Sequence, residues 1–123
     1  MVQDFMKYVV VKPHQSEFPN PIRLKTGDRF SVGDIYEGPE PWANWYLCSA
    51  LGQEPGWVPM QAISFQDDGM GTATMDYTAQ EMDVVLGETV KGGRKLNGWV
   101  WCSSVAADRE GWVPEENLQM LNG

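Results

Sequence analysis

The sequence has little of several features that would assign a protein to a functional class. Its 123 residues include one histidine and two cysteines. A single histidine cannot anchor a metal site, and two cysteines do not make a disulfide framework. We expect Cys48 and Cys102 to lie in the core as small apolar side chains, because neither has a basic neighbour in the sequence that would activate a thiol.

Basic residues are also scarce, with 9 Lys and Arg against 17 Asp and Glu, for a formal net charge of −8. Such a chain repels phosphate backbones and anionic lipids, so we expect neither nucleic acid nor a membrane as partner. The acidity fits a cationic partner and is also common in soluble proteins. No apolar run approaches a membrane span, and residues 1–6 lack a signal-peptide pattern. The sequence therefore predicts a cytoplasmic protein.

Catalytic motifs are missing as well. The sequence has no glycine-rich phosphate loop, no Ser/His/Asp set and no Cys/His pair that a plausible fold would bring together. The acid pairs Asp67-Asp68 and Glu115-Glu116 fall in expected loops, where adjacent residues rarely converge on one substrate. We predict a non-enzymatic protein without cofactor or metal.

What the sequence does contain is an internal repeat. Gly56-Trp57-Val58-Pro59 returns as Gly111-Trp112-Val113-Pro114, and residues 45–49 return as residues 99–103. A repeat at an offset of about 55 residues means that one folding unit is used twice. We predict a first domain at residues 1–65, a polar linker at 66–70 and a second domain at 71–123.

Short alternating apolar stretches, separated by glycine and proline, predict an all-β chain. No segment supports an amphipathic helix of two turns. Each domain is expected to be a small five-stranded barrel filled by a few inward side chains per strand. For the first core we expect Phe30, Val32, Cys48, Val58 and Ile63, and for the second Ala73, Met82, Val84, Val90, Cys102, Val113 and Leu118.

Residues 73–121 resemble a Src-homology 3 (SH3) domain over almost their whole length. Four segments carry the resemblance in the family's order: Ala73–Tyr77 for the Ala-Leu-Tyr-Asp-Tyr opening, Glu81–Glu88 for the acidic segment and diverging turn, Asn97–Trp99 for the tryptophan element, and Gly111–Leu118 for Gly-Tyr-Ile-Pro-Ser-Asn-Tyr-Val. Residues 7–65 resemble the family less closely, because Val9–Pro13 replaces the opening motif. The resemblance implies a variant, bacterial-type protein of two tandem SH3-like barrels.

In SH3 domains an extended proline-rich peptide lies between aromatic side chains. The resemblance implies groove residues in the second barrel at Tyr77, Glu81, Trp99, Trp112, Pro114 and Asn117, and in the first at Trp45, Trp57 and Pro59. Glu81 stands where the family pairs an acid with a ligand's arginine. Met75 and Asn117 replace two of the family's tyrosines, and in the first domain Ala62 and Pro21 replace a tyrosine and the acid. We therefore predict that the second barrel is the main site.

The predicted function is the binding of an extended proline-rich or basic segment of another protein. The main alternative is a structural or oligomerisation module, with a homo-oligomer as one form, in which both grooves are covered and no peptide binds. A third hypothesis is an aromatic cage for a quaternary amine, built from Trp99, Trp112, Tyr77 and Glu81. A fourth, cell-wall peptide binding, requires export. The segment Phe18–Pro21 could itself occupy a groove.

Overall fold

The computed structural model describes residues 6–121 of the chain. Within this range the protein is all β, apart from two single-turn 3-10 helices, η1 (Met60–Ala62) and η2 (Glu115–Asn117). The predicted fold class is confirmed to that extent. Between residues 6 and 121 no helix is long and apolar enough to cross a membrane.

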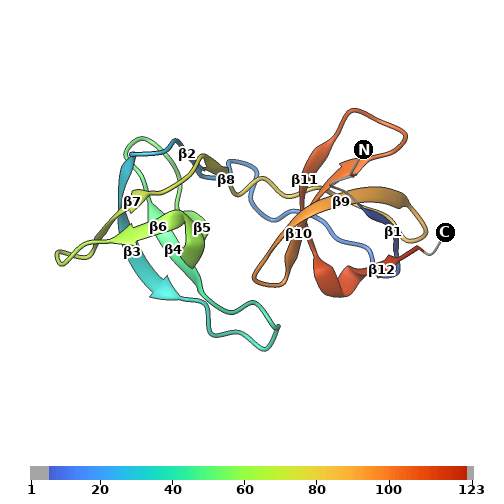
Figure 1. Cartoon of the computed structure of the whole chain (residues 1–123), viewed down its shortest axis with the longest axis horizontal. Coiled ribbons are helices and arrows are strands. Elements are labelled where there is room, and N and C mark those ends of the chain that lie inside the picture. The colour runs from blue at the N-terminus through green and yellow to red at the C-terminus, as the bar shows by residue number, and fades with distance from the viewer. Residues whose placement is uncertain (1–5, 122–123) are drawn as a thin grey trace. The chain divides into compact units, whose positions relative to one another are not determined.

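Residues 18–80 form one compact unit, which we call unit 2. Its five-stranded sheet has the order β5-β4-β3-β7-β6, and every neighbouring pair is antiparallel. The strands are β3 (Arg29–Ile35), β4 (Trp45–Ser49), β5 (Gly56–Pro59), β6 (Ile63–Phe65) and β7 (Met70–Ala73). A short ladder of β2 (Arg23–Leu24) and β8 (Tyr77–Thr78) completes the unit (Figure 1).

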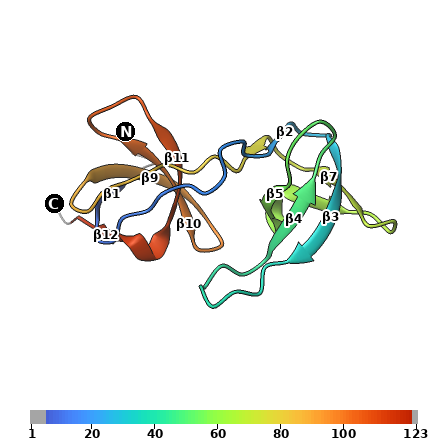
Figure 2. The same ribbon diagram turned by 180° about the vertical axis from the view of Figure 1, so that it is seen from behind.

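Residues 1–17 and 81–123 form the other unit, unit 1, of which the structure describes 6–17 and 81–121. Its sheet has the order β11-β10-β9-β1-β12. The strands are β1 (Met6–Val10), β9 (Thr89–Leu96), β10 (Trp99–Ser104), β11 (Glu110–Pro114) and β12 (Leu118–Met120). The dark-blue β1 lies among orange and red strands in Figure 1, and Figure 2 shows the same sheet from behind.

The two units are interleaved in sequence, which corrects the predicted domain boundaries of 1–65 and 71–123. β1 pairs with β9 and β12, and β7 pairs with β3 and β6. Each sheet thus receives one strand from the half of the chain that was predicted to form the other domain. The predicted linker at residues 66–70 is a hairpin turn between β6 and β7, in which the Gln66 N–H donates to the Met70 carbonyl at 2.8 Å.

Each sheet has five strands, as predicted, but the expected closed barrel does not form. The edge strands are β5 and β6 in unit 2 and β11 and β12 in unit 1, and in residues 6–121 neither edge pairs with its opposite edge. Both units are therefore open antiparallel sheets. Their twist lets the two ends of each sheet approach and enclose one core without a continuous ladder.

The core of unit 1 shows the exchange of strands directly. Buried side chains from β1, the loop before β9 and the strands β9 to β11 form one cluster: Tyr8, Val10, Met82, Val84, Val90, Val100, Cys102 and Val113, with Leu118 packed against it. Most of the predicted second core is confirmed. Ala73 is the exception, because β7 carries it into unit 2, where it is buried with Phe30, Cys48, Val58 and Ile63, and Val32 is half-buried.

The glycine that opens each Gly-Trp-Val-Pro repeat is required by close packing. A Cβ at Gly111 would lie 2.6 Å from the Glu81 carbonyl carbon and 2.7 Å from the Met82 nitrogen. A Cβ at Gly56 would lie 2.6 Å from Ile22 Cγ2. The backbone of Glu81 and Met82 in unit 1, and Ile22 in unit 2, therefore pack directly against this glycine.

We expect Gly111→Ala to lower the free energy of unfolding by about 1–3 kcal/mol, because the added methyl group meets backbone that cannot yield. Chemical denaturation measures this directly. Asp108→Ala, in the exposed β10–β11 turn, is the control and should leave stability unchanged. Equal stability of the two variants would contradict the close packing of the 81–82 segment over Gly111.

Both cysteines are free and buried, which confirms their predicted place in the two cores. Burial raises the pKa of Cys48 and of Cys102 from 9.0 to about 12. At pH 8 the folded protein should leave both thiols unmodified by an aromatic disulfide reagent, and two thiols should react after denaturation. Stability should fall as the pH rises above 9, because the unfolded thiols ionise there and the folded ones do not. Rapid modification of the native protein would contradict this.

Candidate peptide-binding site

In unit 1, a tight turn sets the position of Trp99. Asn97 and Gly98 have positive φ angles of 48° and 91° and join β9 to β10 as a two-residue hairpin. Such turns match the twist of the flanking strands, and asparagine and glycine are the residues that tolerate them. Trp99 begins β10 directly after the turn, and its ladder partner is Pro114 of β11. The structure thus brings these two predicted groove residues together.

His14 lies beside Trp99 and is paired with Glu81. The His14 Nε2 and the Glu81 Oε1 are 2.7 Å apart, with side chains only 17% and 13% exposed. The His14 ring meets the Trp99 ring edge-on, with centroids 5.5 Å apart and an interplanar angle of 78°. Glu81, which was predicted to pair with an arginine of the ligand, is therefore already paired with His14 within unit 1.

Trp112 and Asn117 belong to the same unit but are drawn into its interior. Trp112 is 5% exposed and packs edge-to-face against Trp101, with centroids 5.2 Å apart. Asn117 is 4% exposed, and its side-chain amide donates to the Pro13 carbonyl at 3.2 Å. Its backbone carbonyl accepts from the Val11 N–H at 2.8 Å. Asn117 thus holds the segment after β1 against the sheet.

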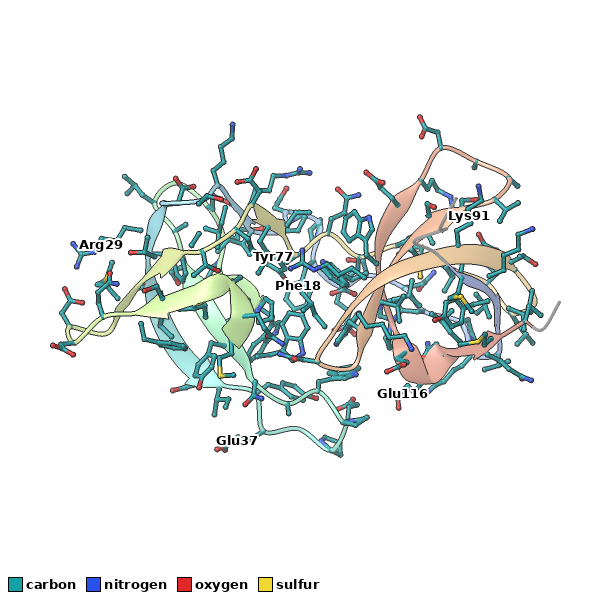
Figure 3. All side chains as sticks on the ribbon, in the orientation of Figure 1. Phe18, Arg29, Glu37, Tyr77, Lys91 and Glu116 are labelled. Atoms are coloured by element: carbon teal, nitrogen blue, oxygen red, sulfur yellow. The ribbon has the colours of Figure 1, made fainter. Side chains whose placement is uncertain are left out.

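Tyr77 does not join these residues. It lies in β8 of unit 2, pairs with Leu24 of β2, and is labelled in Figure 3. Its hydroxyl donates to the Trp57 carbonyl at 2.8 Å. Tyr77 thus belongs to unit 2, whereas Trp99 and Trp112, with which it was expected to group, belong to unit 1. The aromatic cage that needed all three with Glu81 is not assembled within either unit.

Unit 2 instead gathers a set of aromatic side chains around Trp57. Tyr36 meets the Trp57 ring edge-on at a centroid distance of 5.5 Å, and Trp42 lies against Tyr36 at 5.4 Å. We call Tyr36, Trp42 and Trp57 the aromatic cluster; all three are half-buried. The remaining predicted residues of the first repeat, Trp45 and Pro59, are ladder partners at the neighbouring end of β4 and β5, and both are buried.

The long loop of residues 36–44 supplies two members of this cluster. The Tyr36 N–H donates to the Trp45 carbonyl at 2.8 Å, which closes the loop at its base. Asn44 takes a φ of 64° to lead back into β4. The Glu40 carboxylate, which lies later in the same loop, accepts a hydrogen bond from the Tyr36 hydroxyl and so helps to hold the Tyr36 ring in place.

Three of these residues, His14, Tyr36 and Trp42, were not predicted to form a site. A signal for His14 is present in the sequence. Val10 to His14 has the same spacing as Ala73 to Tyr77, and the bridge between His14 and Val84 matches the pair of Tyr77 and Leu24. His14 thus occupies in unit 1 the place of Tyr77 in unit 2. Tyr36 and Trp42 had no counterpart in the second repeat, where the equivalent loop is the two-residue turn.

Hydrogen bonding lowers the pKa of one exposed carboxylate of unit 2. The Asp76 carboxylate accepts from the Thr26 N–H at 2.9 Å and the Thr26 hydroxyl at 3.0 Å, and these bonds lower its pKa below 3.8. This exposed contact ties the segment after β7 to the turn before β3. Among residues 6–121 no group of three or more His, Cys, Asp or Glu side chains could hold a metal ion.

Comparison with known proteins finds similarity to one family in part of the chain. Residues 7–66 match the variant SH3 domain. The chain is 31% identical to the "SH3 and PX domain-containing protein 2B" of mouse and to that of human, in each case over 95% of this chain and 14% of the relative. It thus spans about a seventh of their length. No solved structure gives a significant match.

Residues 7–66 thus resemble the variant SH3 domain, a family of non-catalytic protein-interaction modules. That the second repeat is a further SH3 domain stays a prediction from its resemblance, as does a bacterial origin, since both relatives are mammalian. The match also runs without a break through residues 17 and 18, where the chain passes from unit 1 to unit 2. The segment that resembles the family is therefore divided between the two units.

We expect Tyr77→Phe to lower the free energy of unfolding by about 0.5–1.5 kcal/mol, because it leaves the Trp57 carbonyl without its donor. Thermal denaturation by circular dichroism measures the change. Tyr46→Phe is the matched control, because within residues 6–121 the Tyr46 hydroxyl has no hydrogen-bond partner and its ring only packs on Phe65. Equal loss in both variants would argue against the bond from Tyr77 to Trp57.

Proposed function

We propose that the protein binds an extended, proline-rich or basic segment of another protein, and that the aromatic cluster of unit 2 is its main contact surface. The observation that carries this proposal is the edge-to-face contact of Tyr36 with Trp57, buttressed by the Tyr77 hydroxyl on the Trp57 carbonyl. Rigid aromatic walls suit a polyproline II segment, which is already extended and loses little entropy on binding.

The charge of the same loop supports a basic ligand. Asp34 and Glu37 are exposed close to the aromatic cluster in sequence, and Glu37 is labelled on this loop in Figure 3. Exposed carboxylates attract a Lys or Arg of the ligand over roughly 8 Å at physiological ionic strength. We therefore propose that binding weakens as salt concentration rises, in keeping with the net charge of −8.

Unit 1 is the weaker candidate, although the sequence favoured the second repeat. Its acid, Glu81, is already paired with His14. His14 also occupies in unit 1 the place that Tyr77 has in unit 2. A ligand's arginine would have to displace His14 from Glu81. Trp99 stays half-buried and offers one aromatic wall.

One observation favours the alternative of a structural or self-associating module without a peptide ligand. Trp45 and Trp112, which hold groove positions by resemblance, are each only 5% exposed. Tryptophans buried to this extent stabilise a fold or an interface and do not present their rings to a ligand. Under either hypothesis we propose a cytoplasmic location, with which two free cysteines are compatible.

The test is fluorescence anisotropy with a labelled peptide that contains Pro-x-x-Pro followed by arginine. We expect saturable binding that Trp57→Ala weakens about 30-fold, which corresponds to the roughly 2 kcal/mol typical of a hot-spot residue. Trp99→Ala, which removes the half-buried tryptophan of unit 1, is the comparison variant and should change the affinity less than threefold.

A larger loss in Trp99→Ala than in Trp57→Ala would move the site to unit 1. If the intact protein binds neither this peptide nor an all-basic one, the peptide hypothesis fails. The structural alternative then predicts that Trp45→Ala lowers the melting temperature or dissociates an oligomer, as seen by analytical ultracentrifugation.

A further inference from the structure

The two strands that enter the sheet of the opposite half, β1 and β7, make the same main-chain hydrogen bonds in their respective units. The Val10 N–H donates to Glu88 and the Gly87 N–H donates to Val10, each at 2.8 Å. In unit 2 the Ala73 N–H donates to Asp28 and the Gly27 N–H donates to Ala73, each also at 2.8 Å.

The next residue along repeats the match: Val11 donates to Asn117 at 2.8 Å, and Thr74 donates to Ala62 at 3.0 Å. Backbone pairing therefore cannot decide which of the two strands enters which sheet. We call β1 and β7 the exchanged strands.

Side-chain size differs sharply between the two pairings. In unit 1 the large residue is on the exchanged strand: Tyr8 covers Gly92, where a Cβ would lie 2.5 Å from the Tyr8 ring. In unit 2 the large residue is on the receiving strand: a Cβ at Gly71 would lie 3.0 Å from Val32 Cγ2 and 3.2 Å from the Phe30 ring. Gly71 is also covered by Ile63 of β6, whose Cγ2 would lie 2.8 Å from the added Cβ.

A contiguous arrangement, with β1 in the sheet of β3 and β7 in the sheet of β9, would lose this fit. By the register of the strand pairs, Phe30 corresponds to Val90 and Gly71 corresponds to Tyr8. Tyr8 would then meet Phe30 and Val32, which overpacks one core. The other core would face Gly71 with Gly92 and retain a cavity.

We propose that this size complementarity, Tyr8 with Gly92 and Gly71 with Phe30 and Val32, selects the exchanged pairing within a single chain. The site that recognises each exchanged strand is the surface of the receiving strand, β9 or β3, and its occupant is a segment of the same molecule. The inference does not rest on peptide binding.

Cysteine cross-linking in the full chain tests which pairing forms. Val9 and Gln119 are strand partners, so Val9→Cys with Gln119→Cys should give a disulfide within one chain. In a contiguous arrangement Val9 would take the place of Thr72, whose partner is Ser64. Val9→Cys with Ser64→Cys should therefore remain reduced, whereas Thr72→Cys with Ser64→Cys should close. Cys48 and Cys102 are buried, so they are left unsubstituted in all of these variants.

Non-reducing mass spectrometry reads the result. A 9–119 disulfide in a monomer supports the proposal. A 9–64 disulfide, or a 9–119 disulfide that joins two chains into a dimer, would overturn it.

Inverting the sizes tests the cause. Tyr8→Gly with Gly71→Tyr makes the contiguous pairing the complementary one, so the disulfide should shift from 9–119 to 9–64. A folded double variant that still closes 9–119 and not 9–64 would show that size does not select the pairing.

A second measurement keeps the test decisive if the inverted variant fails to fold. Gly92→Ala should lower the melting temperature because its methyl group meets the Tyr8 ring, and Tyr8→Val in the same chain should recover most of that loss. Gly92→Ala with Val9→Ala is the matched control and should recover none of it. Additive effects at positions 8 and 92 would mean that the two residues do not touch, which contradicts the exchanged pairing.

Discussion

The structure depends on one constraint: each sheet has room for one more strand in its middle, and the strand that fits comes from the other half of the chain. β1 lies between β9 and β12, and β7 lies between β3 and β6. Without that strand the receiving strand would lose a ladder and the core beneath would lose a wall. Neither half of the sequence can complete its own hydrogen bonding alone in this arrangement.

This constraint also determines the composition of the candidate site. The segment that follows each exchanged strand travels with it, so His14 comes to lie beside Trp99 and Glu81, and Tyr77 comes to lie beside Trp57. The two surfaces become chemically different as a result. Unit 1 holds an acid that is paired with His14, whereas unit 2 holds an aromatic cluster beside an acidic loop.

The sequence was sufficient to predict the features that depend on local patterns of residues. Alternation and glycine placement predict an all-β chain of short strands, and the repeated Gly-Trp-Val-Pro marks equivalent places in both units. The domain boundaries were predicted wrongly because the backbone of β1 and β7 is interchangeable, so strand-level patterns are satisfied by either pairing. The two pairings differ in how the side-chain sizes at positions 8, 71, 32 and 92 complement one another. This difference can be judged only once the strand register is known. The placement of Tyr77 could not be predicted for the same reason.

The pairing of Val10 with Leu118 joins the first described strand to the last one. A polypeptide emerging from the ribosome presents β1 long before β9 and β12, so this strand stays without its partners until both have been made. Folding is then governed by contacts between distant parts of the chain, which is the slow regime for β proteins. Loss of β12 would thus leave β1 held on one side only, by its ladder with β9.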